Sequence, residues 1–163
     1  MVKAIYFDMD GTIANLYAVD GWLADLRSEN VRPYKEAETL VNMRKLAKRL
    51  HDLQRMGYHI GVISWGAKFS TDEYLTAVEK AKRAWLNQHL GSVDFDEIKV
   101  VPYGTPKATV VDHPSGLLFD DEEQNRSAWL GTACDVDNIL GTLETLIKGG
   151  LTPLILTLLV RHR

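Results

Sequence analysis

Several features that mark other classes of protein are missing from this sequence of 163 residues. Cys134 is its single cysteine, which excludes an intramolecular disulfide and fits a reducing compartment. No apolar run approaches the roughly 20 residues that cross a bilayer, and the apolar stretch at the N-terminus is too short for a signal peptide. We therefore expect a soluble, cytoplasmic protein with no membrane partner.

The composition also lacks an excess of either charge. The formal net charge is −3 at pH 7, so bulk electrostatics require neither nucleic acid nor an anionic membrane as a partner. Internal repeats and low-complexity tracts are absent as well, and the length suits one hydrophobic core better than two. We expect a single domain over residues 1–163.

Short apolar runs alternate with longer stretches of helical periodicity, which predicts an α/β domain with a mostly parallel sheet. Ser70 and Glu73 form a capping-box pattern at the start of one helix. We expect strands at 4–7, 58–63, 98–101, 117–119 and 132–134, and helices at 21–28, 40–56, 70–90, 122–129 and 136–148.

Polar residues follow three of the expected strands. Asp8, Ser64 and the pair Asp120 and Asp121 each stand where an apolar run ends. The carboxyl ends of parallel strands lie along one edge of a sheet, where ligands bind in open α/β folds. We therefore expect these side chains, which are far apart in sequence, to converge in an active site.

The run FDMDGT at residues 7–12 resembles the first motif of the haloacid dehalogenase (HAD) superfamily, DxDGT. Ser64, Lys107 and the pair Asp120 and Asp121 follow in the order of that family's other motifs. The resemblance implies a Rossmann-like, three-layer α/β/α sandwich and a phosphatase that uses Mg²⁺ and an aspartyl-phosphate. An Asp-x-Asp turn alone is also common loop chemistry, so the prediction depends on the four elements together.

The same resemblance gives the first motif its roles. Asp8 would be the nucleophile, and Asp10 the general acid and base. Gly11 would allow a sharp turn after them. Thr12 would bind phosphate and is expected to fix Asp10 through a hydrogen bond.

Ser64 and Lys107 are expected to be catalytic and to bind the phosphate. The Ser64 hydroxyl would donate to a phosphate oxygen, and the Lys107 ammonium would stabilise charge on the transferred group. A serine after a strand is also an ordinary cap, so Ser64 depends most on the family pattern. Lys68 is the competing lysine, and Lys107 is preferred because it precedes the last acidic motif.

The implied metal ligands are all oxygens, which suit Mg²⁺. They are Asp8, the main-chain carbonyl of Asp10, and the pair Asp120 and Asp121, with Asp120 favoured as the direct ligand. Acidic residues here would also suit a helix N-terminus. Their position directly after the strand 117–119 favours the metal site.

Too few residues separate Thr12 from Ser64 for the cap domain of many relatives, and residues 14–34 would form a minimal cap at most. The arrangement resembles the phosphatase half of polynucleotide kinase/phosphatases and deoxyribonucleotidases. It implies a phosphomonoester substrate, on a nucleotide or a polynucleotide end. The alternatives are another small metabolite, a phosphoprotein, or a non-catalytic binding module of the same fold.

Three aromatic residues near the motifs are candidates for substrate contact. Trp65 would stack on a base or lie buried under the adjacent loop. Tyr17 and Trp22 would line the mouth of the site or simply pack. The basic helix around 44–55 would attract a nucleic-acid backbone if it faced the site entrance, and is otherwise a solvated face.

Residues 150–163 form an apolar C-terminal tail that ends in Arg-His-Arg. Pro153 suits the start of a short helix, which would pack on the domain or on another copy of the chain. A homo-oligomer contact through this tail is therefore a hypothesis.

Overall fold

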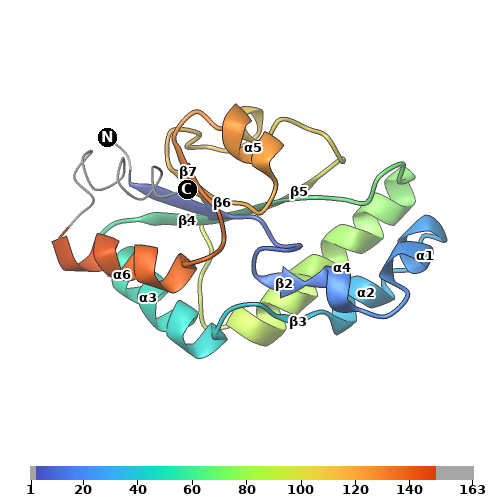
Figure 1. The fold of residues 1–163 in the computed structure, drawn as a ribbon, viewed down its shortest axis with the longest axis horizontal. Coiled ribbons are helices and arrows are strands. Elements are labelled where there is room, and N and C mark those ends of the chain that lie inside the picture. Colours follow the sequence, from blue (N-terminus) through green and yellow to red (C-terminus); the bar gives the residue numbers. More distant parts are fainter. Residues whose placement is uncertain (1–2, 150–163) are drawn as a thin grey trace.

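The computed structural model describes residues 3–149, which form a five-stranded sheet with helices on both faces (Figure 1). The strand order is β5-β4-β1-β6-β7, and neighbouring strands run parallel. The predicted α/β sandwich with a mostly parallel sheet is confirmed. The strands are β1 (Ala4–Phe7), β4 (His59–Trp65), β5 (Glu97–Val101), β6 (Leu117–Phe119) and β7 (Thr132–Cys134).

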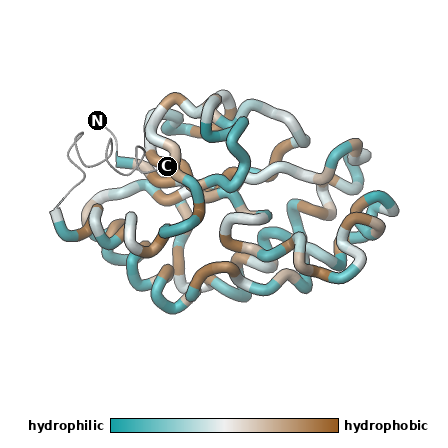
Figure 2. Tube along the Cα trace, viewed as in Figure 1, coloured by the Kyte–Doolittle hydropathy of each residue, from teal (hydrophilic) through white to brown (hydrophobic). Residues whose placement is uncertain are grey.

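Alternate side chains of β1 build the two halves of the core. Ile5 and Phe7 pack on one face with the apolar stripes of helices α3, α4 and α6. Ala4 and Tyr6 pack on the opposite face with Trp129, which follows α5. Figure 2 shows hydrophobic residues along the central strands and a mixed pattern along the outer helices. The helices are α1 (Trp22–Arg27), α2 (Arg32–Glu36), α3 (Met43–Arg55), α4 (Asp72–Leu90), α5 (Glu123–Ala128) and α6 (Ile139–Gly149).

An excursion between β1 and α3 lies beside α4. It contains α1, α2 and an antiparallel pair of two-residue strands, β2 (Ala14–Asn15) and β3 (Glu38–Thr39). Its side chains Leu16 and Tyr34 pack on Tyr74 of α4. The helix α1 agrees with the expected helix at 21–28. Neither α2 nor the strand pair was expected, because such short elements carry no periodicity.

Two local details differ from the sequence-based expectations. The strand β4 continues through Ser64 and Trp65 because both residues pair with β5, so Ser64 lies inside the strand. The predicted capping box at Ser70 is wrong, because Thr71 caps α4 by accepting from the Tyr74 N–H group at 3.2 Å. The Ser70 hydroxyl instead donates to a carbonyl of the preceding turn.

Among residues 3–149, no helix is long and apolar enough to cross a membrane. The predicted oligomer contact through residues 150–163 lies outside the described residues.

Candidate active site

The carboxyl ends of β1, β4 and β6 meet at one edge of the sheet and bring polar side chains together. Asp8 follows β1, Ser64 lies near the end of β4, and Asp120 follows β6. Since β1 lies between the other two strands, Asp8 is central at this edge. The structure therefore gathers residues that the sequence places at separate strand ends.

Lys107 joins the first and last of the sequence motifs. Its Nζ atom donates to Asp8 Oδ1 at 2.8 Å and to Asp120 Oδ2 at 2.6 Å. Burial lowers the pKa of this lysine, but the two carboxylates outweigh burial and raise it, so the group is an ammonium ion. The competing Lys68 lines the cavity beside this pair but forms no ion pair with these carboxylates, and its Nζ atom lies 5.3 Å from the centre of the Phe69 ring.

The turn that follows Asp8 is built around one carbonyl and one glycine. The carbonyl oxygen of Met9 accepts from the N–H groups of the third, fourth and fifth residues after it. Gly11 has a φ of 79°, in the left-handed region, and a Cβ atom there would lie 2.2 Å from Asp121 Oδ2. Gly11 therefore permits the close approach of Asp121.

Thr12 does not hold Asp10, which corrects the expected hydrogen bond between them. Its hydroxyl oxygen lies 3.4 Å from both Asp8 Oδ2 and Asp121 Oδ1, and it accepts from the Asp121 N–H group at 3.3 Å. A hydroxyl has one proton, so Thr12 donates to one of the two carboxylates at a time. Thr12 therefore links the first acidic motif to the last one.

Asp10 is held by Lys82, a residue that the sequence analysis missed. The Lys82 Nζ atom donates to Asp10 Oδ2 at 2.7 Å, to Ser64 Oγ at 2.8 Å and to the Trp65 carbonyl oxygen at 2.7 Å. Lys82 is only 1% exposed and stands three residues before the buried Trp85, on the apolar stripe of α4. A lysine within an apolar stripe is the signal that could have found it.

Carboxylates outnumber cations in this cluster. Lys82 pairs with Asp10, and Lys107 pairs with Asp8 and Asp120, whereas Asp121 forms no ion pair with either ammonium group. Burial, followed by the charge of Asp8, raises the pKa of Asp120 to about 6 and that of Asp121 to about 7. Burial also raises the pKa of Asp10, despite the adjacent ammonium.

The cluster suits a divalent cation. Carboxylate oxygens of Asp8, Asp120 and Asp121 all lie within 4.8 Å of one another. The atoms that these residues offer to a cation are all carboxylate oxygens. The negative charge of the cluster also exceeds the positive charge nearby, as expected for a site that holds Mg²⁺.

Two residues of α5 support the last motif and were not predicted. Asn125 Nδ2 donates to Asp120 Oδ1 at 3.2 Å, and the Glu122 N–H group donates to the same oxygen at 2.9 Å. Arg126 donates to the main-chain carbonyls of Asp120 and Asp121. These contacts fix the orientation of the loop and of the Asp120 carboxylate.

A cavity of about 550 Å³ lies beside the pair Asp8 and Lys107. The Trp65 ring lies 4.8 Å from the Tyr103 ring, and its Nε1 atom donates to the Thr105 carbonyl oxygen. Trp65 is therefore held in the wall of the cavity. The aromatic lining residues are Tyr17, Trp22, Tyr34, Trp65, Phe69 and Tyr103.

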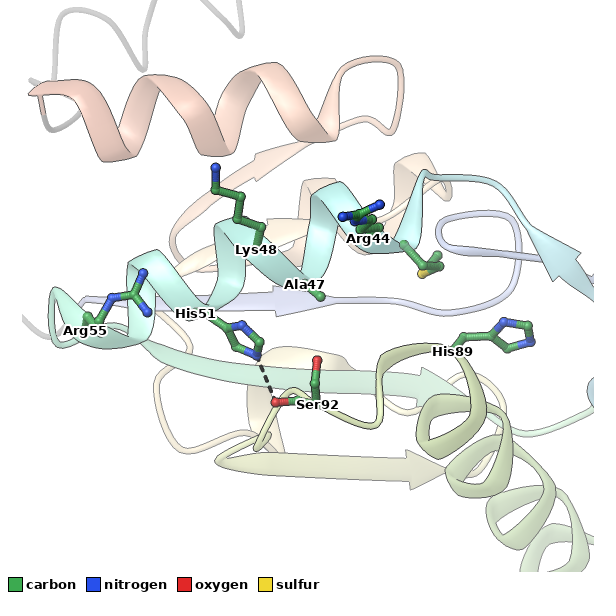
Figure 3. Close-up of a pocket in the computed structure, with 8 residues that line it drawn as sticks. Arg44, Ala47, Lys48, His51, Arg55, His89 and Ser92 are labelled. Carbon is green, nitrogen blue, oxygen red and sulfur yellow. Dashed lines mark hydrogen bonds between the residues drawn. The ribbon is translucent and has the colours of Figure 1, made fainter.

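Three basic residues of α3, Arg44, Lys48 and Arg55, line a different cavity. Figure 3 shows them along the helix from Arg44 to Arg55, with His89 and Ser92 on neighbouring segments. The His51 ring lies against the Ser92 carbonyl oxygen, with Nε2 at 2.8 Å. The described residues that line this cavity include none that line the cavity beside Asp8. The basic face of α3 therefore lies away from the entrance of the candidate active site.

No protein-family model matches the chain, and no curated protein matches its sequence. Among solved structures, its fold is similar to that of D,D-heptose 1,7-bisphosphate phosphatase from Burkholderia thailandensis, with a TM-score of 0.53. The match covers 90% of this chain and 99% of that one, at 13% sequence identity. This similarity establishes the fold and agrees with the α/β sandwich with a mostly parallel sheet that the sequence predicts.

Proposed function

We propose that this protein is an Mg²⁺-dependent phosphomonoester hydrolase that works through an aspartyl-phosphate on Asp8. One observation carries the proposal: the Asp8 carboxylate is paired with the buried Lys107 ammonium and borders an open cavity that Asp10 also lines. This combines a nucleophile, a fixed positive charge and an acid–base group around one space. The similarity in fold to a phosphatase supports the same reaction.

The proposed reaction has two steps. In the first, the Asp8 carboxylate attacks phosphorus, and the bond to the leaving oxygen breaks with its electron pair moving to that oxygen. The leaving oxygen takes a proton from Asp10 in its acid form. In the second, the Asp10 carboxylate takes a proton from water, the water oxygen attacks phosphorus, and Asp8 is released. An ester and water thus give an alcohol and inorganic phosphate.

The metal ligands in this proposal are the carboxylates of Asp8, Asp120 and Asp121 and the main-chain carbonyl of Asp10. Asp120 would bind directly and Asp121 through water. When bound, Mg²⁺ would offset the repulsion between the nucleophile and a dianionic phosphate ester. The surplus of negative charge in the cluster supports this assignment.

Ser64, Thr12 and Lys107 would hold the phosphate. The Ser64 hydroxyl accepts from Lys82 at 2.8 Å, which leaves its own proton for a phosphate oxygen. The Lys107 ammonium would stabilise charge on the transferred group, because a buried positive charge acts strongly where water is excluded.

The aromatic cavity supports a nucleotide as substrate. Flat rings of Trp65, Tyr103 and Phe69 offer surfaces on which a base can stack. Lys68, 5.7 Å from the centre of the Tyr103 ring, adds positive charge near a phosphate-bearing ligand. Residues 14–34 would act as the minimal cap, because several of them line the cavity.

A nucleotide is favoured over a long polynucleotide end, because the basic face of α3 lines a separate cavity. A phosphorylated sugar is the alternative suggested by the name of the structural neighbour. A binding module without turnover is the alternative from another class.

The test is phosphate release from a panel of phosphomonoesters, with Mg²⁺ or with a chelator. The panel contains 5′- and 3′-nucleotides, 3′-phosphorylated oligonucleotides and sugar phosphates. We expect Mg²⁺-dependent release, highest with a nucleotide and lost in Asp8→Asn. Release from no ester, by folded protein that binds Mg²⁺, would favour the binding module instead.

A further inference from the structure

A buried lysine beside the candidate catalytic groups takes no direct part in either step of the proposed reaction. Lys82 comes from the middle of α4, and its side chain is 1% exposed. Its ammonium contacts two candidate catalytic residues at once, Asp10 at 2.7 Å and Ser64 at 2.8 Å. It therefore connects the end of β4 to the turn that follows β1.

The ammonium has no capacity left to bind a substrate. An ammonium carries three N–H donors, and the three acceptors in reach are Asp10 Oδ2, Ser64 Oγ and the Trp65 carbonyl oxygen. The Tyr34 ring covers it further, with its centre 5.0 Å from Nζ. Lys82 therefore acts on its neighbours rather than on the reacting atoms.

The contact determines which oxygen of Asp10 is available. Oδ2 is bound to Lys82, whereas Oδ1 accepts no hydrogen bond from the described residues. Asp10 also lines the cavity. With Oδ2 fixed, Oδ1 is the oxygen that serves the leaving group.

We propose that Lys82 is a positioning residue that fixes Asp10 for proton transfer to the leaving oxygen. The same ammonium holds Ser64 in a constant position relative to Asp10. This inference rests on the proposed phosphatase activity. Because Lys82 determines the position of the Asp10 carboxyl group, loss of Lys82 should slow the hydrolysis of esters whose leaving oxygen needs a proton. Esters with a stable leaving anion should be affected far less.

The experiment compares two substrates in Lys82→Met, which matches the aliphatic part of the lysine side chain and removes the ammonium donors. For an alkyl phosphate, kcat should fall about 100-fold, the usual range for general acid catalysis. For p-nitrophenyl phosphate, whose leaving phenolate is stable, kcat should fall less than about tenfold. Lys80→Met, an exposed lysine on the same helix, should leave both values unchanged.

Asp10→Asn should show the same dependence on the leaving group, and the double variant should lose little more, because both residues act in one step. An equal loss for both esters would overturn the positioning role. Should Lys82→Met not fold, Lys82→Arg serves instead, since its longer planar group must displace Asp10. An unchanged ratio between the esters in Lys82→Arg would also overturn the inference. No hydrolysis by the unmodified protein would refute the proposed function itself.

Discussion

Asp8 and Lys107 form a buried ion pair, with 2.8 Å between Asp8 Oδ1 and Lys107 Nζ. The two residues lie 99 positions apart: Asp8 directly follows β1, and Lys107 lies in the segment between β5 and β6. The second carboxylate on this ammonium, Asp120 at 2.6 Å, follows β6 directly. One cation thus holds Asp8, the proposed nucleophile, close to Asp120.

Replacement of this cation should abolish most of the activity. In Lys107→Met, kcat should fall by about 10²- to 10³-fold, the usual loss when a preorganised electrostatic group is removed. The loss should be similar for an alkyl ester and for p-nitrophenyl phosphate, because the proposed role of Lys107 is to stabilise charge on the phosphoryl oxygens, which both esters share. Initial rates over a range of substrate concentrations measure this. Lys45→Met on the exposed face of α3 is the control, and a rate close to wild type in Lys107→Met would contradict the proposed role.

Mg²⁺ should bind more tightly as the pH rises. In the metal-free protein, burial and the charge of Asp8 raise the pKa of Asp120 to about 6 and of Asp121 to about 7. Below these values the carboxyl groups hold protons that a cation must displace, and above them they are free to bind. Affinity should therefore increase between pH 5.5 and 8, by up to about tenfold per pH unit for each proton displaced.

Calorimetric titration with Mg²⁺ in buffers of different ionisation enthalpy counts the released protons. Asp121→Asn should flatten the dependence on pH. An affinity that does not change with pH in the wild-type protein would contradict the assignment of these carboxylates as ligands.

The fold was predictable where a local pattern was sufficient. Buried strands such as β1 and β6 are continuous apolar runs, and α3 has clear helical periodicity. The pair β2 and β3 has two residues in each strand, so no alternation marks it. The extent of β4 was also missed, because pairing with β5, and not its own sequence, carries the strand through Ser64.

The candidate site likewise contains residues that the sequence identified and a contact that depends on the fold. Asp8, Lys107 and Asp120 were placed by motif order, and the structure brings them together. The contact of Lys82 with Asp10 joins residues 72 positions apart on a helix and a turn. It depends on how α4 crosses the sheet, and a single sequence does not contain that geometry. Thr12 was given the wrong partner because the turn directs its hydroxyl toward Asp8 and Asp121 instead of Asp10.

The exposed ring of Phe69 should contribute to nucleotide binding. Phe69 lines the cavity, yet its side chain is 93% exposed and its φ is 60°, a conformation that disfavours large residues. In Phe69→Ala, KM for a nucleoside monophosphate should rise about 5- to 100-fold, the effect of losing one stacked base. KM for ribose 5-phosphate should change little.

Leu130→Ala is the matched control for this prediction, since Leu130 is 72% exposed and does not line the cavity. Equal changes in KM for the nucleotide and for the sugar phosphate would argue against stacking and in favour of a sugar phosphate as the substrate.

Away from the site, Glu97 should make the stability of the fold depend on acid pH. Burial alone raises the pKa of Glu97, but hydrogen bonds from Lys99 and Tyr6 outweigh burial and hold the pKa below its usual range. Because the unfolded chain then binds the proton more tightly, the stabilisation is present above pH of about 4.5, the ordinary glutamate value, and is lost as the pH falls through the lower folded value.

Glu97→Gln keeps the shape of this side chain and removes its charge. At pH 7 it should lower the free energy of unfolding by about 1.5–3 kcal/mol, the range for hydrogen bonds to a charged group. The variant should also lose less stability than the wild-type protein between pH 5 and pH 3, because the titrating group is gone. Urea unfolding at a series of pH values measures both effects. Glu79→Gln is the control, because the pair of Glu79 with Arg83 is exposed and contributes at most about 1 kcal/mol. If the free energy of unfolding changed with pH in the same way in the wild-type protein and in Glu97→Gln, this carboxylate would not be the group that makes the stability depend on acid pH.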